Sequence, residues 1–261
     1  MINVGASIET TRTTLALAEA YDYIYAAVGV HPSDIDGLNE ETYSWLKEQT
    51  AHPKTVAVGE IGLDYYWDKE PEVQAAQREW FVRQLTLAGE TDLPVIIHSR
   101  DAAEDTMQIL KRPEDSGTSR RHSLLLVLAG AGKEYVKMGY CIGVGGVVTF
   151  KNAKKLRQTV EQVSLEHILL ETDCPYMAPE PHRGTATIPP TSLMWLPGLR
   201  RSKASLCRRW SRRPGKMPAV YSASGRCLPE SAEAGNIPGC LPNSASGLTA
   251  SASLDFCGIL W

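Results

Sequence analysis

The first 184 residues alternate short apolar runs with longer amphipathic segments, and this alternation limits the fold more than any other feature of the chain. The apolar runs contain few polar residues, as is typical of strands buried on both faces of a parallel sheet. The segments between them carry apolar residues at helical spacing. Strands are predicted at 2–5, 23–30, 55–63, 94–98, 141–144 and 167–171, and helices at 7–21, 39–50, 73–89, 101–111 and 152–163.

Strict alternation of strands and helices indicates an α/β fold with a parallel sheet. Several predicted strands end in a polar or ionisable residue, as expected in a (β/α)8 barrel, where the carboxyl ends of the strands form the active-site face. A doubly wound sheet would instead carry a glycine-rich phosphate loop. Gly143, Gly145 and Gly146 do not fit that fingerprint. The pattern therefore favours the barrel over the doubly wound sheet.

The chain changes character near residue 185. Residues 1–184 hold 18 Lys and Arg against 27 Asp and Glu, whereas residues 185–261 hold 9 against 3. All six histidines precede residue 185, and the later segment is rich in Pro, Ser, Gly, Ala and Arg without helical or strand periodicity. We expect a folded unit at 1–184 and a basic, disordered tail at 185–261.

Composition narrows the setting of the protein. The net charge of -3 gives no global signal for nucleic acid or for an anionic membrane. No apolar run approaches the roughly 20 residues that span a bilayer, and the N-terminus does not resemble a signal peptide. A cytoplasmic protein without a membrane partner or an obligatory protein partner is expected. The six cysteines form no C-x-x-C pair, which favours free thiols over a disulfide framework or a zinc site.

Three side chains at the ends of predicted strands are candidates for metal-dependent chemistry. Glu60, His98 and Asp173 each follow an otherwise apolar run. Carboxylate oxygen and imidazole nitrogen are the ligands that divalent cations use in hydrolases. For each residue a structural alternative stands beside this one, because a buried carboxylate also needs an ion-pair partner and a strand-end histidine is often only hydrogen-bonded.

Further polar residues lie where a substrate could contact them. His31 follows a strand, and Arg100 lies two residues after His98. His182 and Arg183 stand in a loop that could contact phosphate or simply be solvated. Arg100, Asp101 and Glu171 could support the metal ligands or form ordinary surface ion pairs.

Five separated strings make the chain resemble the TatD family of metal-dependent deoxyribonucleases. They are GVHP at 29–32, VGEIGLDYY at 58–66, PVIIHSRDA at 94–102, TFKNAKKLR at 149–157 and LLETDCPYMAPEPHRG at 169–184. The resemblance covers about 2–112 and again about 133–184. It implies a (β/α)8 barrel of the TIM type with two divalent metal ions (Mg, Mn or Zn) at its C-terminal face. It also implies hydrolysis of DNA, with 3′→5′ exonuclease-like action.

The resemblance assigns roles to the strand-end residues. Glu60 matches the carboxylate that bridges the two metals, and His98 matches a ligand of one metal. Asp173 matches a ligand of the other metal, and also the group expected to orient or deprotonate the attacking water. Glu60 and Asp173 are therefore the catalytic candidates.

The sequence departs from the family in three places. Family members open with a strand bearing His-x-His-x-Asp, whereas Met1–Gly5 resembles their second strand. The segment at about 113–132 permits a local frameshift, which leaves His122 one position from a family metal ligand and makes it a candidate ligand. The segment 185–261 is consistent with out-of-frame translation. We therefore expect an N-terminally truncated, incomplete barrel with gaps where the first and sixth strands belong, and weak folding because such gaps expose sheet edges.

Four functions follow from these observations. The first is a two-metal phosphodiesterase acting on DNA ends. The second is a catalytically dead, degenerate fragment of such an enzyme. The third is a binding module whose basic tail contacts nucleic acid, and it ranks lowest because the tail lacks regularly spaced aromatic residues. A related metal hydrolase of another ester or an amide is also possible, since one fold hosts many chemistries.

Overall fold

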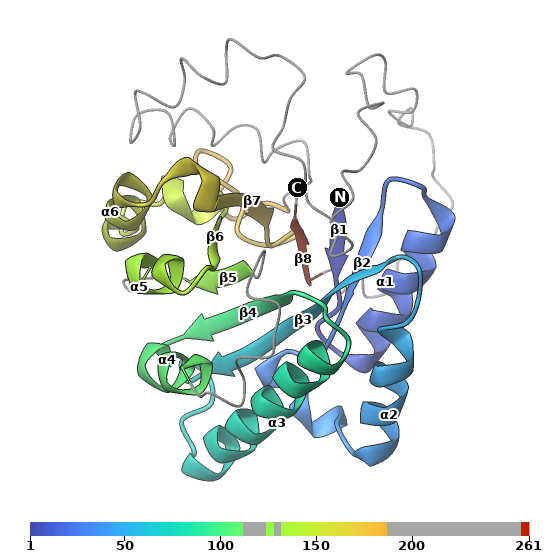
Figure 1. Ribbon diagram of the computed structural model, residues 1–261. Coiled ribbons are helices and arrows are strands. Elements are labelled where there is room, and N and C mark those ends of the chain that lie inside the picture. Colours follow the sequence, from blue (N-terminus) through green and yellow to red (C-terminus); the bar gives the residue numbers. More distant parts are fainter. Residues whose placement is uncertain (112–123, 128–131, 187–256, 261) are drawn as a thin grey trace.

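The computed structural model describes residues 1–111, 124–127, 132–186 and 257–260 (Figure 1). Within these four segments, eight strands form one sheet that closes on itself in chain order, from β1 to β8. The strands are β1 (Ile2–Val4), β2 (Tyr25–Val28), β3 (Thr55–Asp64), β4 (Val95–Arg100), β5 (Leu124–Val127), β6 (Cys141–Val144), β7 (Ile168–Thr172) and β8 (Cys257–Leu260).

Strands β1 to β7 are parallel, and each pairs with the next strand along the chain. The eighth strand is antiparallel to both of its neighbours: Leu260 lies opposite Ile2 of β1 and opposite Glu171 of β7. Figure 1 shows β1 and β8 side by side. The barrel is thus closed by a segment that runs against the direction of the other seven strands.

Helices connect the parallel strands and cover the outside of the sheet (Figure 1). They are α1 (Ile8–Ala20), α2 (Glu40–Gln49), α3 (Pro71–Glu90), α4 (Ala103–Leu110), α5 (Gly132–Lys137) and α6 (Lys154–Gln162), with short 3-10 turns at Pro32–Gly37, Gly146–Thr149 and Leu165–His167. Ser7 and Asn39 accept hydrogen bonds from backbone N–H groups in the first turns of α1 and α2, so both helices begin at capped residues.

The apolar side chains divide between the inside and the outside of the barrel. Val28 of β2 packs outward with Leu15 and Ala18 of α1. Its neighbour Ala27 packs in a separate cluster with residues of five other strands. Alternate residues of a strand point to opposite faces, so this second cluster fills the barrel interior. Its members are Val4, Ala27, Ala57 and Ile96, with Ile2, Cys141 and Leu169 packed against them.

The parallel α/β barrel confirms the predicted fold class. The incomplete barrel is also confirmed, since the described part of 1–184 supplies seven parallel strands and not eight. The gap expected at the sixth strand was wrong because β5 occupies it, and the place of the missing first strand is taken by β8, from outside 1–184. Strand β5 pairs with β4 and β6 where the altered sixth strand was expected, and β8 lies between β7 and β1. Backbone hydrogen bonding explains the difference, since an apolar run such as LLLV can complete a ladder even where its side chains no longer match a family motif.

The two predicted frameshifted segments lie largely outside the described residues. Residues 257–260 of the predicted tail form β8, and 124–127 form β5. His122 falls outside the described residues. None of the helices in the described part of the chain combines the length and the apolar composition that a bilayer-crossing helix requires.

Candidate metal centre

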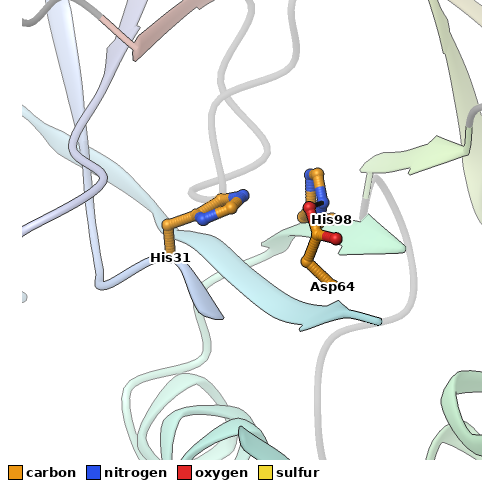
Figure 2. Close-up of side chains that lie close together, drawn as sticks. All are labelled: His31, Asp64 and His98. Atoms are coloured by element: carbon orange, nitrogen blue, oxygen red, sulfur yellow. Dashed lines mark hydrogen bonds and ion pairs between the residues drawn. The ribbon is translucent and has the colours of Figure 1, made fainter. Parts of the chain in front are cut away.

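Three side chains converge where β2, β3 and β4 end. His31 follows β2, Asp64 is the last residue of β3, and His98 lies near the end of β4. One potential ligand atom from each lies within 4.8 Å of the other two. Figure 2 shows the His31 ring directed toward the pair formed by Asp64 and His98. Because these strands are parallel, their carboxyl ends meet at one mouth of the barrel, where barrel enzymes hold their active sites.

His98 lies between two carboxylates. Its Nδ1 is 3.1 Å from Glu60 Oε1, and its Nε2 is 3.0 Å from Asp64 Oδ2. Burial alone would lower the pKa of this histidine, but the hydrogen bonds and negative charges of Asp64 and Glu60 outweigh it and raise the pKa to about 9. The ring is therefore a cation at neutral pH, held between two carboxylates. Its positive charge balances their negative charge, as a bound metal ion would.

Asp64 is almost completely buried and serves two groups at once. Its Oδ2 faces His98, while its Oδ1 accepts hydrogen bonds from the backbone N–H of Tyr66 at 2.9 Å and of Trp67 at 3.4 Å. Burial would raise the pKa of this carboxyl group, but the hydrogen bond and charge of His98 hold it below its usual value. In metal sites, a carboxylate commonly bonds one ring nitrogen of a histidine and so orients the other nitrogen toward the metal, and Asp64 is placed to do this for His98.

His31 is held in one tautomer by the turn that follows it. Its Nδ1 accepts a hydrogen bond from the backbone N–H of Ser33 at 3.1 Å, so the proton of the neutral ring lies on Nε2. Burial, followed by the nearby charge of His98, lowers the pKa of His31 to about 4, and the ring is neutral at pH 7. The protonated nitrogen donates hydrogen bonds and is not free to bind a metal. His31 therefore suits contact with an anionic substrate better than metal ligation, although it lies in the cluster.

Two carboxylates from the end of β7 face the same centre. Desolvation and the negative charge of Glu60 raise the pKa of Asp173 to about 6. Desolvation, then the charges of Asp173 and Glu60, raise the pKa of Glu171 well above its usual value. A side chain at Gly145 would overlap the carboxylate of Glu171, so this glycine makes room for it at the end of β6. Several carboxylates thus share one small volume.

The donor chemistry of these residues fits a divalent cation. Carboxylates that raise one another's pKa by repulsion are stabilised when a cation enters their site. Glu60, Asp173 and one nitrogen of His98 would hold the ion, and the carboxylate on the other nitrogen of His98 would orient its ring. The structure therefore brings together the three strand-end residues that the sequence singled out: Glu60 and His98 are hydrogen-bonded, and their charges act on Asp173.

Helix α3 holds the strand ends in position through two buried glutamines. Gln84 accepts from the N–H of Val30 at 2.9 Å and donates to its carbonyl at 3.1 Å, next to His31. Gln77 accepts from the N–H of Asp64 at 3.0 Å and donates to the carboxylate of Asp68 at 2.7 Å. These glutamines lie seven residues apart, on one face of the helix. Each satisfies backbone groups that a barrel strand leaves unpaired where it ends.

The remaining sequence candidates are Arg100, His182 and Arg183. Arg100, at the end of β4, places its guanidinium 3.8 Å from the ring centroid of Tyr66, and its charge lowers the pKa of both His31 and Asp173. Arg183 is exposed and stacks 4.4 Å from the centroid of Phe150. His182 is exposed in the same loop. Their predicted substrate contacts stay predictions.

Asp64 and the two glutamines were absent from the sequence-based site, and Glu171 was only a possible supporting residue. A signal existed for both carboxylates. Asp64 lies four residues after Glu60, and Glu171 lies two residues before Asp173. Because a strand repeats every two residues, an even spacing places both members of a pair on one face. The glutamines carried a weaker signal: both lie on the apolar face of their helix, where a polar side chain needs a hydrogen-bond partner, but the spacing does not name that partner.

Comparison with known proteins identifies relatives over most of the chain. Residues 1–195 match the model of the family described as TatD related DNase. A Bacillus subtilis (strain 168) protein named uncharacterized metal-dependent hydrolase YabD is 42% identical over 189 residues, which cover 72% of this chain and 73% of that protein. A Mycobacterium tuberculosis protein named uncharacterized metal-dependent hydrolase TatD is 34% identical over 232 residues, which cover 87% and 84%.

A solved structure shares the fold. The crystal structure of YJJV, a TatD homolog from Escherichia coli K12, superposes with a TM-score of 0.70 at 33% sequence identity and covers 77% of each chain. The match of the family model to 1–195, and the alignment of the mycobacterial relative over 87% of the chain, both continue past residue 184. The assignment of 185–261 to a separate tail stays a prediction.

Proposed function

The chain belongs to the TatD related DNase family of metal-dependent hydrolases, and from this premise we propose that it hydrolyses phosphodiester bonds at DNA ends in the 3′→5′ direction. The observation that carries the proposal is the combination of Glu60, His98 and Asp173 around one centre, with hydrogen-bond donors for a phosphate beside it. The proposal adds a substrate, DNA, and a direction of hydrolysis, 3′→5′, to the general assignment as a metal-dependent hydrolase.

The residues of the chain divide the work. Glu60, His98 and Asp173 would hold the divalent cations, which would supply Lewis-acid stabilisation of charge on the phosphate and a more acidic water nucleophile. Asp173 orients the attacking water and accepts its proton. The Nε2–H of His31 and the guanidinium of Arg100 face the same mouth and stabilise negative charge on the phosphate oxygens. Asp64 fixes the ring of His98 throughout.

One observation favours a second candidate, a chain that binds cations without hydrolysing DNA. The family resemblance implies histidine ligands from the first strand and from the strand between β4 and β6. Here β5 consists of Leu124–Val127, whose side chains carry no metal-binding atom, and β8 occupies the position beside β1. The loss of ligands weakens metal affinity because each donor contributes to binding. Under this alternative the barrel is a degenerate fragment with residual cation binding.

The deciding experiment uses a single-stranded oligonucleotide labelled at its 5′ end, with Mg²⁺ or Mn²⁺. Hydrolysis from the 3′ end yields a ladder of successively shorter labelled products. Glu60→Ala removes a bridging carboxylate and is expected to abolish the ladder, whereas Glu41→Ala alters an exposed glutamate at the start of α2 and should leave it unchanged. Metal binding without any ladder from the wild-type chain would refute the nuclease and support the cation-binding fragment.

A further inference from the structure

Exposed aromatic and large apolar side chains gather at one end of the barrel. Among the described residues, four of them lie in the loops that follow β3 and β7, at the mouth that holds the metal ligands: Tyr66, Trp67, Tyr176 and Met177. Tyr21 and Tyr23 are also exposed, but they precede β2 and so lie at the opposite end. Exposed apolar clusters beside a polar site commonly mark a binding surface.

Tyr66, Trp67 and Arg100 form one compact group within this cluster. The rings of Tyr66 and Trp67 meet edge to face, with centroids 4.7 Å apart and an interplanar angle of 86°. The guanidinium of Arg100 lies 3.8 Å from the Tyr66 centroid and 5.5 Å from the Trp67 centroid. Trp67 is nevertheless 67% exposed, so most of its indole surface is open to solvent. An exposed, flat indole beside a cation is suited to stacking.

The same carboxylate positions this aromatic group and the metal ligand. Asp64 accepts hydrogen bonds from the backbone of both Tyr66 and Trp67 with Oδ1, while its Oδ2 contacts His98. The Cα atoms of Asp64 and Trp67 are three residues apart, which limits their separation to about 11 Å. The indole therefore lies in a loop directly beside the candidate metal centre, and a buried residue fixes the start of that loop.

We propose that Trp67, supported by Tyr66 and Arg100, is a stacking site for an unpaired nucleobase next to the scissile phosphate. This inference rests on the proposed nuclease function and assigns the contact with the base to one named side chain. Every base has a π-face, so stacking on an aromatic side chain tolerates any sequence. A base within a duplex is already stacked and paired, and it reaches the indole only after the end of the duplex opens.

The size of the group favours a base over a protein partner. Two aromatic side chains bury at most about 300–500 Å² together, which is well below the roughly 800 Å² per partner of a standard protein interface. A single nucleobase needs only one open ring face. The adjacent guanidinium supplies a positive charge for the phosphate that follows the base.

Binding of a fluorescent oligonucleotide in the presence of EDTA tests the inference without hydrolysis. The oligonucleotide carries fluorescein at its 5′ end, and anisotropy reports its affinity for the full chain. Trp67→Ala is expected to weaken binding about 5- to 150-fold, the range for loss of one stacked base. Trp67→Phe should retain most of the affinity. Tyr23→Ala, which removes an exposed aromatic side chain at the opposite end of the barrel, should change nothing.

A second series replaces each of the last three nucleosides in turn with an abasic tetrahydrofuran. At the position that stacks, the abasic oligonucleotide should bind wild type and Trp67→Ala equally. If the tryptophan variant loses the same factor on all oligonucleotides, or none, or if wild type binds no oligonucleotide, the stacking site is wrong. Failure of the nuclease appears separately, because a chain that binds the bases but produces no ladder refutes only the proposed hydrolysis.

Discussion

Substituting Gln84 with methionine isolates the contribution of α3 to the site. Methionine is unbranched and similar in length, so Gln84→Met removes the amide group without opening a large cavity. Gln84 is 1% exposed and Val30 is fully buried, so water cannot replace the lost partner. The N–H and carbonyl of Val30, now bonded to Gln84 at 2.9 and 3.1 Å, would both lose that bond.

The expected cost follows from these two backbone groups. A buried donor or acceptor left without a partner costs about 1–3 kcal/mol, which gives about 2–6 kcal/mol for the pair. A domain is typically stable by only about 5–15 kcal/mol. The variant should therefore unfold at a clearly lower urea concentration. Since Val30 precedes His31, the position of that imidazole should also become less well defined.

Urea unfolding followed by circular dichroism measures the change in the free energy of unfolding. Gln108→Met is the matched control, because Gln108 is an exposed glutamine on α4 and its replacement should change stability by less than about 0.5 kcal/mol. A loss below about 1 kcal/mol for Gln84→Met, or an equal loss in the control, would show that α3 does not hold the end of β2 as argued.

Three further predictions concern the metal centre and its strands. Mn²⁺ at about 100 times its dissociation constant should stabilise the wild-type fold by roughly 2.7 kcal/mol, measured by thermal denaturation. Glu60→Gln should lose most of this gain. An equal gain in the wild type and the variant would mean that the ion binds elsewhere. A ring nitrogen of His98 must release its proton to bind a metal, and the pKa of His98 is raised to about 9. Metal affinity should therefore rise as the pH increases toward 9. Calorimetry that finds a constant affinity between pH 6.5 and 9 would contradict this prediction. Gly62→Ala should destabilise the barrel by several kcal/mol, since Gly62 has a φ of 143° and an added Cβ would overlap the carbonyl oxygen of His98. Gly37→Ala is the control, because an added Cβ there meets nothing within 4 Å. Equal denaturation midpoints for the two variants would refute the steric argument.

The periodicity of the sequence predicted the barrel well because it reports burial directly. The apolar runs at 55–63 and 94–98 became β3 and β4 with small changes at their ends. Glu60, His98 and Asp173 could be found for the same reason. An ionisable residue in or just after an apolar run is costly unless it has a partner, so its presence indicates a site.

Other features depended on contacts that periodicity does not encode. The tautomer of His31 follows from one hydrogen bond to Ser33, which the GVHP string does not reveal. Gln84 bonds Val30, 54 residues earlier, and Gln77 bonds Asp64, 13 residues earlier. Helical spacing shows that both glutamines lie on the apolar face, but it does not show which strand ends they contact. Strand β8 was missed because the four residues 257–260 carry no pattern strong enough to predict their partners, β1 and β7.

The closure of the barrel by β8 has a consequence for synthesis of the protein. Ile2 pairs with Leu260, so the two strands are separated by nearly the whole chain. At about 5–20 residues per second, a ribosome needs on the order of 10–50 s to pass from one strand to the other. Throughout that interval β1 and later β7 have a free edge that another strand can join. The nascent chain is therefore exposed to pairing with neighbouring nascent copies, and its yield in the cell should depend on chaperones that shield those edges.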